Sequence, residues 1–337
     1  MNKYNPNFPK LFALLNDGNV HEGSAIGKRL GISRNAVWKL MNQLGEEGIP
    51  ISSYQSKGYQ LLAPVHLLDK EQILAALKPK TIRNAVALTV YHTVDSTNDV
   101  IKKLPQSDKI QFCVSEKQLQ GRGRRNDPWL SPFGVNIYLS CLYPLQKDIC
   151  EYSGLSIVVG LSLIQALVDA KVDVPLQIKW PNDILCQGKK CGGILVELNV
   201  KMHMPGMAVI GIGLNVNQPF VPYPTDLKAI SLGEVAKKNF DRNILIAAII
   251  KSLLGELSLF SDAGFSPFMK MWENYDCLKG KMITIQAPKN TVQGEAMGIT
   301  EQGLLKLKDQ NGEIRTFSAG DVTLSGKKAV GKFSQGA

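Results

Sequence analysis

The chain has 337 residues, of which 44% are hydrophobic and 20% are charged, and its formal net charge is +10. This length allows two or three domains with a sizeable core, and the composition excludes an intrinsically disordered or fibrous chain. No uninterrupted apolar run approaches the roughly 20 residues that a membrane span needs, and the N-terminus lacks the apolar stretch of a signal peptide. We therefore expect a cytoplasmic protein with no membrane partner.

The positive charge indicates anionic partners without singling out one domain, because it amounts to +3 in residues 1–62, +4 in 63–275 and +3 in 276–337. The six cysteines include no C-x-x-C pair and the four histidines are isolated from one another. Neither a disulfide framework nor a zinc site is predicted. Cys186 and Cys191, which flank a Gly-Lys-Lys turn, are expected to be ordinary buried thiols.

Residues 8–62 show the pattern of a winged helix. Amphipathic segments at 8–18 and 24–31, the second capped by its first serine, precede a tight turn at Gly31-Ile32 and a third segment at 33–44. Two short helices joined by a turn that contains Gly are typical of a helix-turn-helix. The alternating segment that follows, ISSYQSKGYQLL, predicts a hairpin.

In this reading the start of the third helix would face the major groove, and a lysine in the hairpin turn would contact phosphate. The expected DNA-binding residues are Ser33, Arg34, Asn35, Trp38, Lys39 and Lys57. The alternative is a three-helix packing module that binds no DNA.

After Pro64 the next 200 residues or so mix strands with helices. Strands are expected over 85–94, 112–118, 135–144, 176–180 and 207–217, a hairpin over 183–200, and helices over 70–77, 95–104, 153–171 and 242–275. Because several strands are neighbours in sequence, a mixed sheet with helices mainly on one face is expected. The fold class is therefore α+β.

From Cys277 onward, short alternating segments separated by Gly turns predict a small all-β barrel. The last dozen residues, GKKAVGKFSQGA, have the composition of a disordered tail. The expected organisation is a winged helix at 1–64, a central domain at 65–275, a barrel at 276–326 and a tail at 327–337.

The segment QGRGRRNDPWLSPFG, residues 120–134, places three arginines and two glycines in six residues. Glycine lets the backbone fold closely round a ligand, and guanidinium groups present planar forks of donors that suit carboxylate or phosphate oxygens. Pro128 and Pro132 and the lack of apolar periodicity favour a mobile loop. The pattern indicates an anion-binding loop, with a solvated basic turn as the alternative.

Four further polar clusters fall where strands are expected to end. They are Asp95 to Asn98 before a helix, Lys179 to Asp183 (KWPND), Lys190 with Gly192-Gly193, and Asn215 in GIGLNVN. Hydroxyls at a helix start, flexible arginines, a lysine and one exposed aspartate suit a reaction that holds negative charge while phosphoryl oxygens change partners. The chain has no Walker A motif and no GxGxxG, and GIG alone is a weak signal.

In this order and behind a winged helix, GRGRR, KWPND, GKKCGGILVE and GIGLNVN resemble the motifs of the bifunctional biotin protein ligases that are also biotin operon repressors. The resemblance covers essentially the whole chain. It implies a central domain like that of class II synthetases and an SH3-like C-terminal barrel. It also implies ATP and Mg²⁺ as cofactors, biotinyl-5′-AMP as intermediate and corepressor, and transfer of biotin to a lysine of the biotin carboxyl carrier protein of acetyl-CoA carboxylase. A ligand-promoted homodimer would bind operator DNA of the biotin synthesis operon.

The same resemblance assigns roles to residues. Biotin would be held by Ser96, Thr97, Asn98, Gln118, Arg122, Gly123, Arg124 and Lys190, and ATP or its adenine by Trp129, Asn182, Asn215 and Phe317. The catalytic residues would be Arg122, Arg124, Lys190 and Asp183, the last orienting the acceptor amine or a Mg²⁺. This agrees with simple electrostatics, because the attacking carboxylate and the α-phosphate are both negative and need cations between them.

The chain departs from the family pattern at three of these positions. Phe317 stands where Trp is usual, Asn126 where Gly is common and Gln120 where a small residue is usual. Since Asn tolerates positive φ better than most side chains, the loop is expected to keep its chemistry.

Three other functions remain open. A lipoyl or octanoyl transferase would not explain the winged helix or GRGRR, and a metabolite-sensing regulator without catalysis would not need KWPND and Lys190. A ligase that no longer represses transcription would be distinguished by a gel shift with and without biotin plus ATP.

Overall fold

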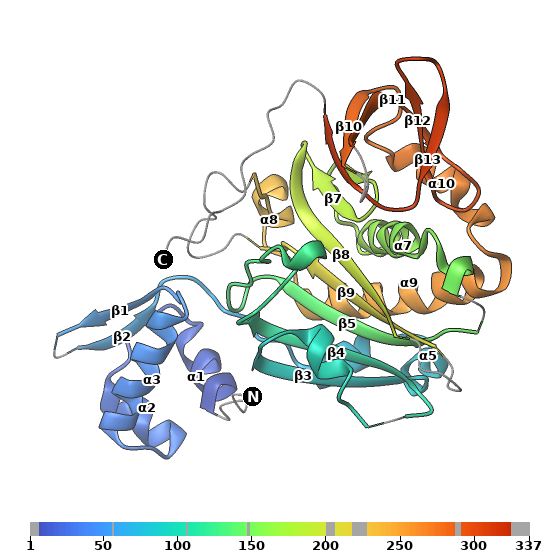
Figure 1. Cartoon of the computed structure of the whole chain (residues 1–337). Coiled ribbons are helices and arrows are strands. Elements are labelled where there is room, and N and C mark those ends of the chain that lie inside the picture. The colour runs from blue at the N-terminus through green and yellow to red at the C-terminus, as the bar shows by residue number, and fades with distance from the viewer. Residues whose placement is uncertain are drawn as a thin grey trace.

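The computed structural model describes residues 7–55, 57–105, 107–146, 149–199, 206–217, 228–286 and 291–324. Three parts follow one another along the chain, a small helical part with a hairpin, a large central sheet with helices, and a small β-sheet part at the C-terminal side (Figure 1). The tail predicted at 327–337 lies outside the described residues.

The N-terminal part is the predicted winged helix. Its elements are α1 (Asn7–Leu15), α2 (Gly23–Leu30), α3 (Arg34–Glu46), β1 (Ile51–Tyr54) and β2 (Gly58–Leu61). The two strands pair antiparallel. Ser33 caps α3, since its side chain accepts a hydrogen bond from the Ala36 amide at 3.2 Å. The cap predicted at Ser24 is wrong, because α2 begins at Gly23 after Glu22, whose side chain makes no capping bond.

The winged helix packs directly on the central domain. Its apolar core includes the fully buried Phe8 and also Phe133, which lies near the end of the arginine-rich segment 120–134. The His92 ring of the central sheet packs against both phenyl rings, with its centroid 4.7 Å from each of theirs. A polar contact reinforces this interface, because Lys117 of the central domain pairs with Glu47 at the end of α3. The two parts therefore share one apolar cluster.

The central sheet has seven strands in the order β3-β4-β5-β9-β8-β7-β6. The strands are β3 (Val86–Val94), β4 (Ile110–Gln118), β5 (Ile137–Pro144), β6 (Leu176–Lys179), β7 (Asp183–Cys186), β8 (Lys189–Asn199) and β9 (Met207–Leu214). Only the β3–β4 pair is parallel among these described strands, with Val90 opposite Val114. The mixed sheet expected from the sequence is confirmed.

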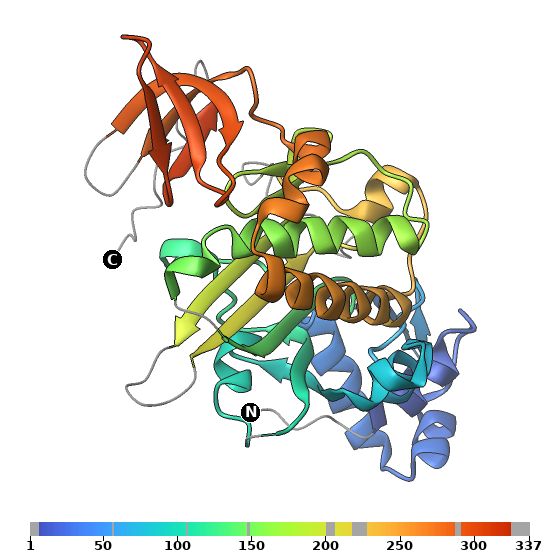
Figure 2. The same cartoon turned by 90° about the vertical axis from the view of Figure 1, so that its right-hand side faces the viewer.

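The helices lie mainly on one face of this sheet, where α7 (Leu155–Asp169) and α9 (Arg242–Ala263) pack side by side (Figure 2). The shorter helices are α4 (Lys70–Ala76), α5 (Lys80–Asn84), α6 (Thr97–Ile101), α8 (Leu232–Ala236) and α10 (Met269–Tyr275), with 3₁₀ turns η1 (Arg124–Asn126), η2 (Ile149–Tyr152) and η4 (Ser266–Phe268). α5 and α8 were not predicted. Each spans five residues, too short for an apolar period to appear.

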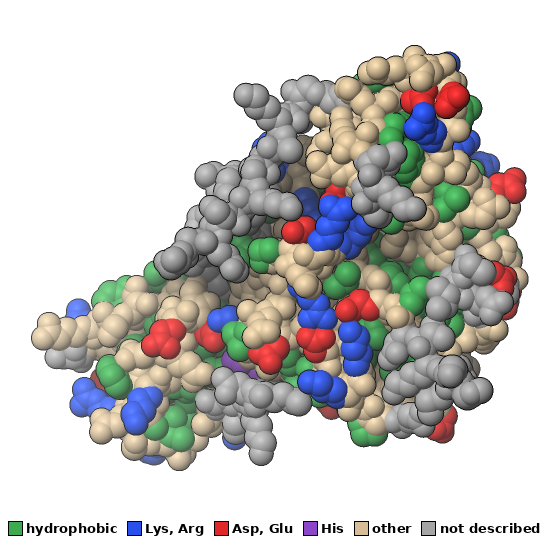
Figure 3. All heavy atoms as spheres, in the orientation of Figure 1, with side chains coloured by type: hydrophobic (Ala, Val, Ile, Leu, Met, Phe, Trp, Pro, Cys, Tyr) green, Lys and Arg blue, Asp and Glu red, His purple; other side chains and the backbone are tan. Residues whose placement is uncertain are grey.

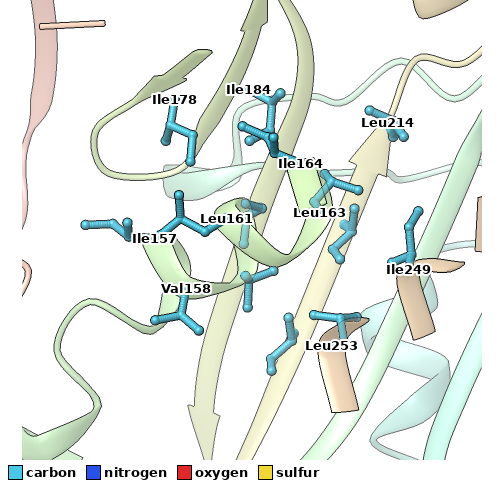
Figure 4. Packing of buried hydrophobic residues seen from close by; sticks show 14 of the residues in the cluster. Ile157, Val158, Leu161, Leu163, Ile164, Ile178, Ile184, Leu214, Ile249 and Leu253 are labelled. Atoms are coloured by element: carbon cyan, nitrogen blue, oxygen red, sulfur yellow. The ribbon is translucent and has the colours of Figure 1, made fainter. Parts of the chain in front are cut away.

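The core lies between α7, α9 and the sheet. Figure 4 shows the isoleucine, leucine and valine side chains of α7 gathered with those of the sheet and of α9. Gly160 lets α7 approach the sheet closely, since a Cβ there would meet the side chains of Ile178 and Ile194 at 3.3 Å. Each fully buried side chain of this kind contributes about 1.5–3 kcal/mol. This packed layer leaves the opposite side of the sheet for the polar residues.

By length and composition α9 could cross a membrane, since an 18-residue window has a mean hydropathy of 1.8. In the fold, however, half of this window is buried, and α9 packs on α7 and α4. Its first residue, Arg242, is buried and pairs with Glu116 at 2.7 Å while donating to the His66 carbonyl at 2.6 Å. α9 is accounted for as a core helix.

The C-terminal part is an antiparallel sheet in the order β13-β12-β11-β10-β14. Its strands are β10 (Met282–Gln286), β11 (Thr291–Ile299), β12 (Leu305–Asp309), β13 (Ile314–Phe317) and β14 (Asp321–Leu324). Burial alternates along β11, as expected for a strand with one face on a core. The Trp180 indole donates to the Gly303 carbonyl at 3.1 Å and so ties KWPND to this part.

Candidate active site

A cavity of about 290 Å³ lies on the polar side of the central sheet, next to the C-terminal part. Its wall comes from α6, the arginine-rich segment 120–134 (hereafter the arginine loop), KWPND, β8, β9 and β14. The lining residues include Ser96, Thr97, Asn98, Gln118, Arg122, Gly123, Arg124, Trp129, Lys179, Asn182, Asp183, Lys190, Gly211, Gly213, Asp321, Val322 and Thr323. Figure 3 shows Lys, Arg, Asp and Glu side chains gathered in the middle of this face.

The polar end of the cavity, defined by Ser96, Thr97, Asn98 and Gln118, carries uncharged donors and acceptors. Ser96, Thr97 and Asn98 form the start of α6 and are 3–4% exposed. The Thr97 amide and hydroxyl donate to Gln118 Oε1 at 2.9 and 3.1 Å. Gln118 Nε2 in turn donates to the Ser131 hydroxyl at 3.2 Å. These groups are held in place by one another.

The glycines of GIG form part of the floor of the cavity. A Cβ on Gly211 would lie 2.5 Å from Asn98 Oδ1, and one on Gly213 would lie 2.6 Å from the Trp129 ring. Both side chains therefore rest directly on the backbone of β9, which any larger residue would prevent. GIG was a weak signal in the sequence. In the structure its two glycines leave room for the side chains of Asn98 and Trp129.

The charged end of the cavity, defined by Arg122, Arg124, Lys190 and Asp183, begins with a bidentate ion pair. Arg122 donates to both carboxylate oxygens of Asp99 at 2.7 Å and to Glu197 at 3.3 Å. The hydrogen bond from Arg122 lowers the pKa of Asp99, and Asp99 raises the pKa of Arg122. For Glu197, burial raises the pKa, but hydrogen bonds from Asn98 and Lys102 outweigh it and the net pKa is lowered.

Arg124 and Arg125 join the arginine loop to β14 and the turn before it. Arg124 donates to the Gly320 carbonyl at 3.1 Å and lies 3.8 Å from Asp321, and Arg125 pairs with the same aspartate. Arg125 and Asn126 have φ of 55° and 61°. Asn126 thus adopts the left-handed conformation that Asn tolerates, in agreement with the expectation from its substitution for Gly.

Lys190 and Asp183 meet across the β7–β8 hairpin. Lys190 Nζ lies 2.6 Å from Asp183 and 5.5 Å from the centre of the Trp129 ring. A second cation, Lys179, is 3.9 Å from the same carboxylate. The tight turn between the strands uses Gln187 and Gly188, both with positive φ, which directs Lys190 back over the sheet.

Two of the four residues expected at the adenine site do not line the cavity. Asn215 is 4% exposed, and its amide donates to the Ile230 carbonyl at 3.3 Å, so it braces the end of β9. Phe317 pairs with Leu305 in the ladder of the C-terminal sheet and packs on the core. The adenine roles of these two residues stay predictions, and the C-terminal part reaches the cavity through Asp321, Val322 and Thr323.

The carboxylates that face the arginines were not predicted from the sequence. Asp99, Glu197 and Asp321 lie on α6, β8 and β14. Glu197 is the last residue of the GKKCGGILVE motif, but no role was predicted for any of the three. Asp99 directly follows Ser96-Thr97-Asn98, which is the one local signal that could have found it. Glu197 is 75 residues from Arg122, a pairing that only the sheet topology establishes.

Among the residues that the structure describes, no group of three or more His, Cys, Asp or Glu side chains could hold a metal ion. Mg²⁺ that arrives with nucleotide phosphates needs only one or two carboxylates, which Asp183 fits by its place in the wall. The five cysteines whose burial is described, including Cys186 and Cys191, are buried and free.

The winged helix presents the predicted DNA-binding side chains to solvent. Ser33, Arg34, Asn35, Trp38 and Lys39 are exposed on α3, and Lys57 is exposed in the hairpin turn. The Trp38 side chain is 55% exposed, although its neighbours Val37 and Leu40 are buried. These side chains are therefore accessible on the second helix of the motif, which is the helix that enters the major groove in helix-turn-helix proteins.

Comparison with known proteins shows which families share this architecture. Three protein-family models match, namely the HTH domain at residues 10–60, the Biotin/lipoate A/B protein ligase family at 90–215 and the Biotin protein ligase C terminal domain at 279–325. The fold and cavity are thus those of a biotin/lipoate-type ligase that carries a helix-turn-helix.

Among solved structures, the biotin protein ligase from Aquifex aeolicus in complex with biotin and ATP superposes with a TM-score of 0.62 at 28% identity, covering 71% of this chain and 99% of that one. The bifunctional ligase/repressor BirA of Escherichia coli is 35% identical over 94% of this chain and 96% of its own length, and that of Bacillus subtilis is 32% identical over 90% and 93%. The chain belongs to the family of bifunctional biotin protein ligases and repressors.

Proposed function

We propose that the cavity activates biotin with ATP and passes it from biotinyl-5′-AMP to a lysine of a biotin carboxyl carrier protein, and that the same chain represses transcription. Family membership and the helix-turn-helix domain support both activities. The observation that carries the ligase activity is the convergence of Arg122, Arg124 and Lys190 on one cavity that is also lined by the uncharged Thr97, Asn98 and Gln118.

The two ends suit the two ends of biotin. In the first step a biotin carboxylate oxygen attacks the α-phosphorus of ATP, the new O–P bond forms, and pyrophosphate leaves with the broken P–O bond. Both reacting groups are anionic, so the cations Arg122, Arg124 and Lys190 lower the repulsion between them. The neutral ureido ring fits the polar end, where Thr97, Asn98 and Gln118 offer uncharged hydrogen-bonding atoms.

In the second step the carrier lysine nitrogen attacks the acyl carbon of biotinyl-5′-AMP, an amide bond forms, and AMP leaves as the amine loses a proton. Asp183 is proposed to orient that amine or a Mg²⁺ on the phosphates, because its carboxylate lies in the wall beside Lys190 and Lys179. Mg²⁺ would supply charge neutralisation at the pyrophosphate. Trp129 and Asn182 remain the proposed adenine-side residues.

Repression is proposed to act through a homodimer. One winged helix makes few base contacts, and specific operators are usually read by two-fold dimers. A ligand shifts a dimer equilibrium only by its differential affinity for the two states, so the corepressor must change the central domain surface, with the arginine loop as the element that changes. We also propose domain boundaries near residues 64 and 275. The proposed location is the cytoplasm, where the carrier protein and the operator occur.

The ligase activity is tested by incubating the chain with ATP, labelled biotin and a carrier domain, where ATP-dependent labelling of one carrier lysine is expected. Repression is tested by sedimentation without ligand, with biotin, and with biotin plus ATP, each followed by a gel shift on the promoter of the biotin synthesis operon. We expect dimerisation and a shift mainly with biotin plus ATP. A chain that stays monomeric in all three, or binds the operator equally well without ligand, would contradict the repressor activity alone.

A further inference from the structure

One fully buried hydroxyl, that of Ser140, lies beneath the polar end of the cavity. Ser140 belongs to β5 and is outside every motif identified in the sequence. Its Oγ lies 2.7 Å from Thr97 Oγ1 and 2.6 Å from Asn98 Oδ1, two groups that line the cavity. Ser140 itself does not line the cavity, so its contacts reach a ligand only through those two residues.

The hydrogen-bond directions around Ser140 follow from the charge of Glu197. The lowered pKa of Glu197 keeps its carboxylate ionised near neutral pH, and an ionised carboxylate only accepts. Asn98 must therefore direct its Nδ2 at Glu197, which is 2.7 Å away, and its Oδ1 at Ser140. An amide oxygen only accepts, so the single Ser140 proton is donated to Asn98.

With that proton committed, Ser140 Oγ can only accept from the Thr97 hydroxyl. The Thr97 proton then lies inside the protein, shared between Ser140 Oγ and Gln118 Oε1 at 3.1 Å. Its oxygen therefore presents lone pairs, and no proton, to the cavity. The orientation of Gln118 is consistent, because its Oε1 accepts from Thr97 while its Nε2 donates to Ser131.

We propose that Ser140 is a positioning residue for the acyl substrate, which keeps Thr97 Oγ1 an acceptor and so selects a ring that carries an N–H donor. This inference rests on the proposed function. The ureido ring of biotin has two such donors, whereas the dithiolane ring of lipoate has none. The matched family model covers biotin and lipoate ligases alike, so a feature that distinguishes the two rings has to lie in the particular side chains around the pocket.

The test is steady-state pyrophosphate exchange with Ser140→Ala, which removes one oxygen atom. Asn98 Oδ1 then loses its donor, and the Thr97 proton keeps only the Gln118 oxygen as acceptor. Losing the partner of a buried polar group reduces binding by roughly ten- to a hundredfold. We expect KM for biotin to rise by about tenfold or more while kcat and KM for ATP stay within about twofold. Desthiobiotin, which keeps the ureido ring and lacks the thioether, should lose the same factor as biotin.

A matched control is Ser162→Ala, which also removes a fully buried hydroxyl. Ser162 Oγ donates to Ser252 Oγ at 3.0 Å between α7 and α9, on the far side of the sheet from the cavity. This variant should leave KM for biotin unchanged even if its melting temperature falls. Ser140→Cys, whose thiol is a weaker donor, should give a KM between those of wild type and Ser140→Ala.

Any of three results with Ser140→Ala would overturn the inference. The first is a KM for biotin within twofold of wild type, and the second is an equal rise in KM for ATP. The third is a KM for desthiobiotin that does not rise as the KM for biotin does. If Ser140→Ala does not fold, Ser140→Cys carries the test, and a wild-type KM there overturns it too. Absence of biotin-dependent exchange in the wild-type chain would instead contradict the proposed function.

Discussion

The two ends of the cavity differ in how much of their binding arrangement exists before a ligand arrives. At the polar end, hydroxyl and amide groups already satisfy one another through Thr97, Gln118 and Ser140, and Thr97 and Ser140 are only 4% and 0% exposed. At the charged end, Arg122, Arg124 and Lys190 are partly exposed and each already contacts a protein acceptor. The first end is preorganised for its ligand, and the second has to exchange partners.

This difference assigns substrate selectivity to the polar end and the reaction chemistry to the charged end. A preorganised polar end binds without further ordering and can reject a ring of the wrong hydrogen-bonding type. Carboxylates at the charged end keep three or more cations together without a ligand, since Asp99, Glu197, Asp321 and Asp183 offset their repulsion. When a phosphate binds, it takes the place of a carboxylate as the anionic partner of these cations. The exchange of one anion for another then changes the electrostatic free energy of the site little.

The largest effect is expected for Lys190→Ala, because this removes the cation nearest to Asp183 and the Trp129 ring. The adenylation rate should fall by about 10²–10³, the usual cost of losing one preorganised transition-state contact. Transfer from preformed biotinyl-5′-AMP should fall much less. Single-turnover assays of the two half-reactions measure this, and equal losses in both would contradict the role given to Lys190.

The control for that experiment lies one residue away. Lys189 begins β8 and is exposed, and successive residues of a strand point to opposite faces, so Lys189→Ala changes the same charge without touching the cavity. Both half-reactions should proceed in this variant at rates near those of wild type.

A smaller effect is expected for Arg124→Ala, since one charge-assisted hydrogen bond contributes about 1.5–3 kcal/mol. Biotinyl-5′-AMP should dissociate roughly 10–100 times faster, and the fold should remain intact. Release of labelled adenylate from the enzyme measures the rate. Arg315→Ala, which removes an arginine paired with Asp309 on the C-terminal sheet, serves as the control. Adenylate retention equal to wild type in Arg124→Ala would exclude this role.

The smallest effect concerns the carboxylates. Arg122 lowers the pKa of Asp99, so their ion pair stabilises the folded state above the ordinary aspartate pKa, near pH 4, and this contribution is lost as the pH falls through the lowered value. Asp99→Asn lacks this contribution at every pH. Its melting temperature should therefore be slightly below that of wild type at pH 6, and the difference should shrink toward pH 3. A difference independent of pH would contradict the ion-pair explanation.

Local patterns predicted the strands, the winged helix and the polar end well, because each depends on residues close in sequence. Ser96 to Asn98 needed only a helix start, and Lys190 only a hairpin. The carboxylate partners depended on contacts between distant segments, which periodicity does not report. The same limit explains Asn215 and Phe317, since only the tertiary arrangement decides whether a strand-end residue faces the cavity or the core.

The place of Phe133 has a practical meaning for shortened forms of the chain. Its ring is 1% exposed because the winged helix covers it, and the His92 ring beside it is covered by Phe8. In a ligase that begins at residue 65, this aromatic pair and Val65 would form an exposed hydrophobic patch. Such a truncated enzyme is expected to self-associate in proportion to its concentration, and Phe133→Ser, combined with the truncation, should restore a monodisperse preparation. A truncation at the domain boundary expected from the sequence motifs would therefore expose side chains that are buried in the full chain.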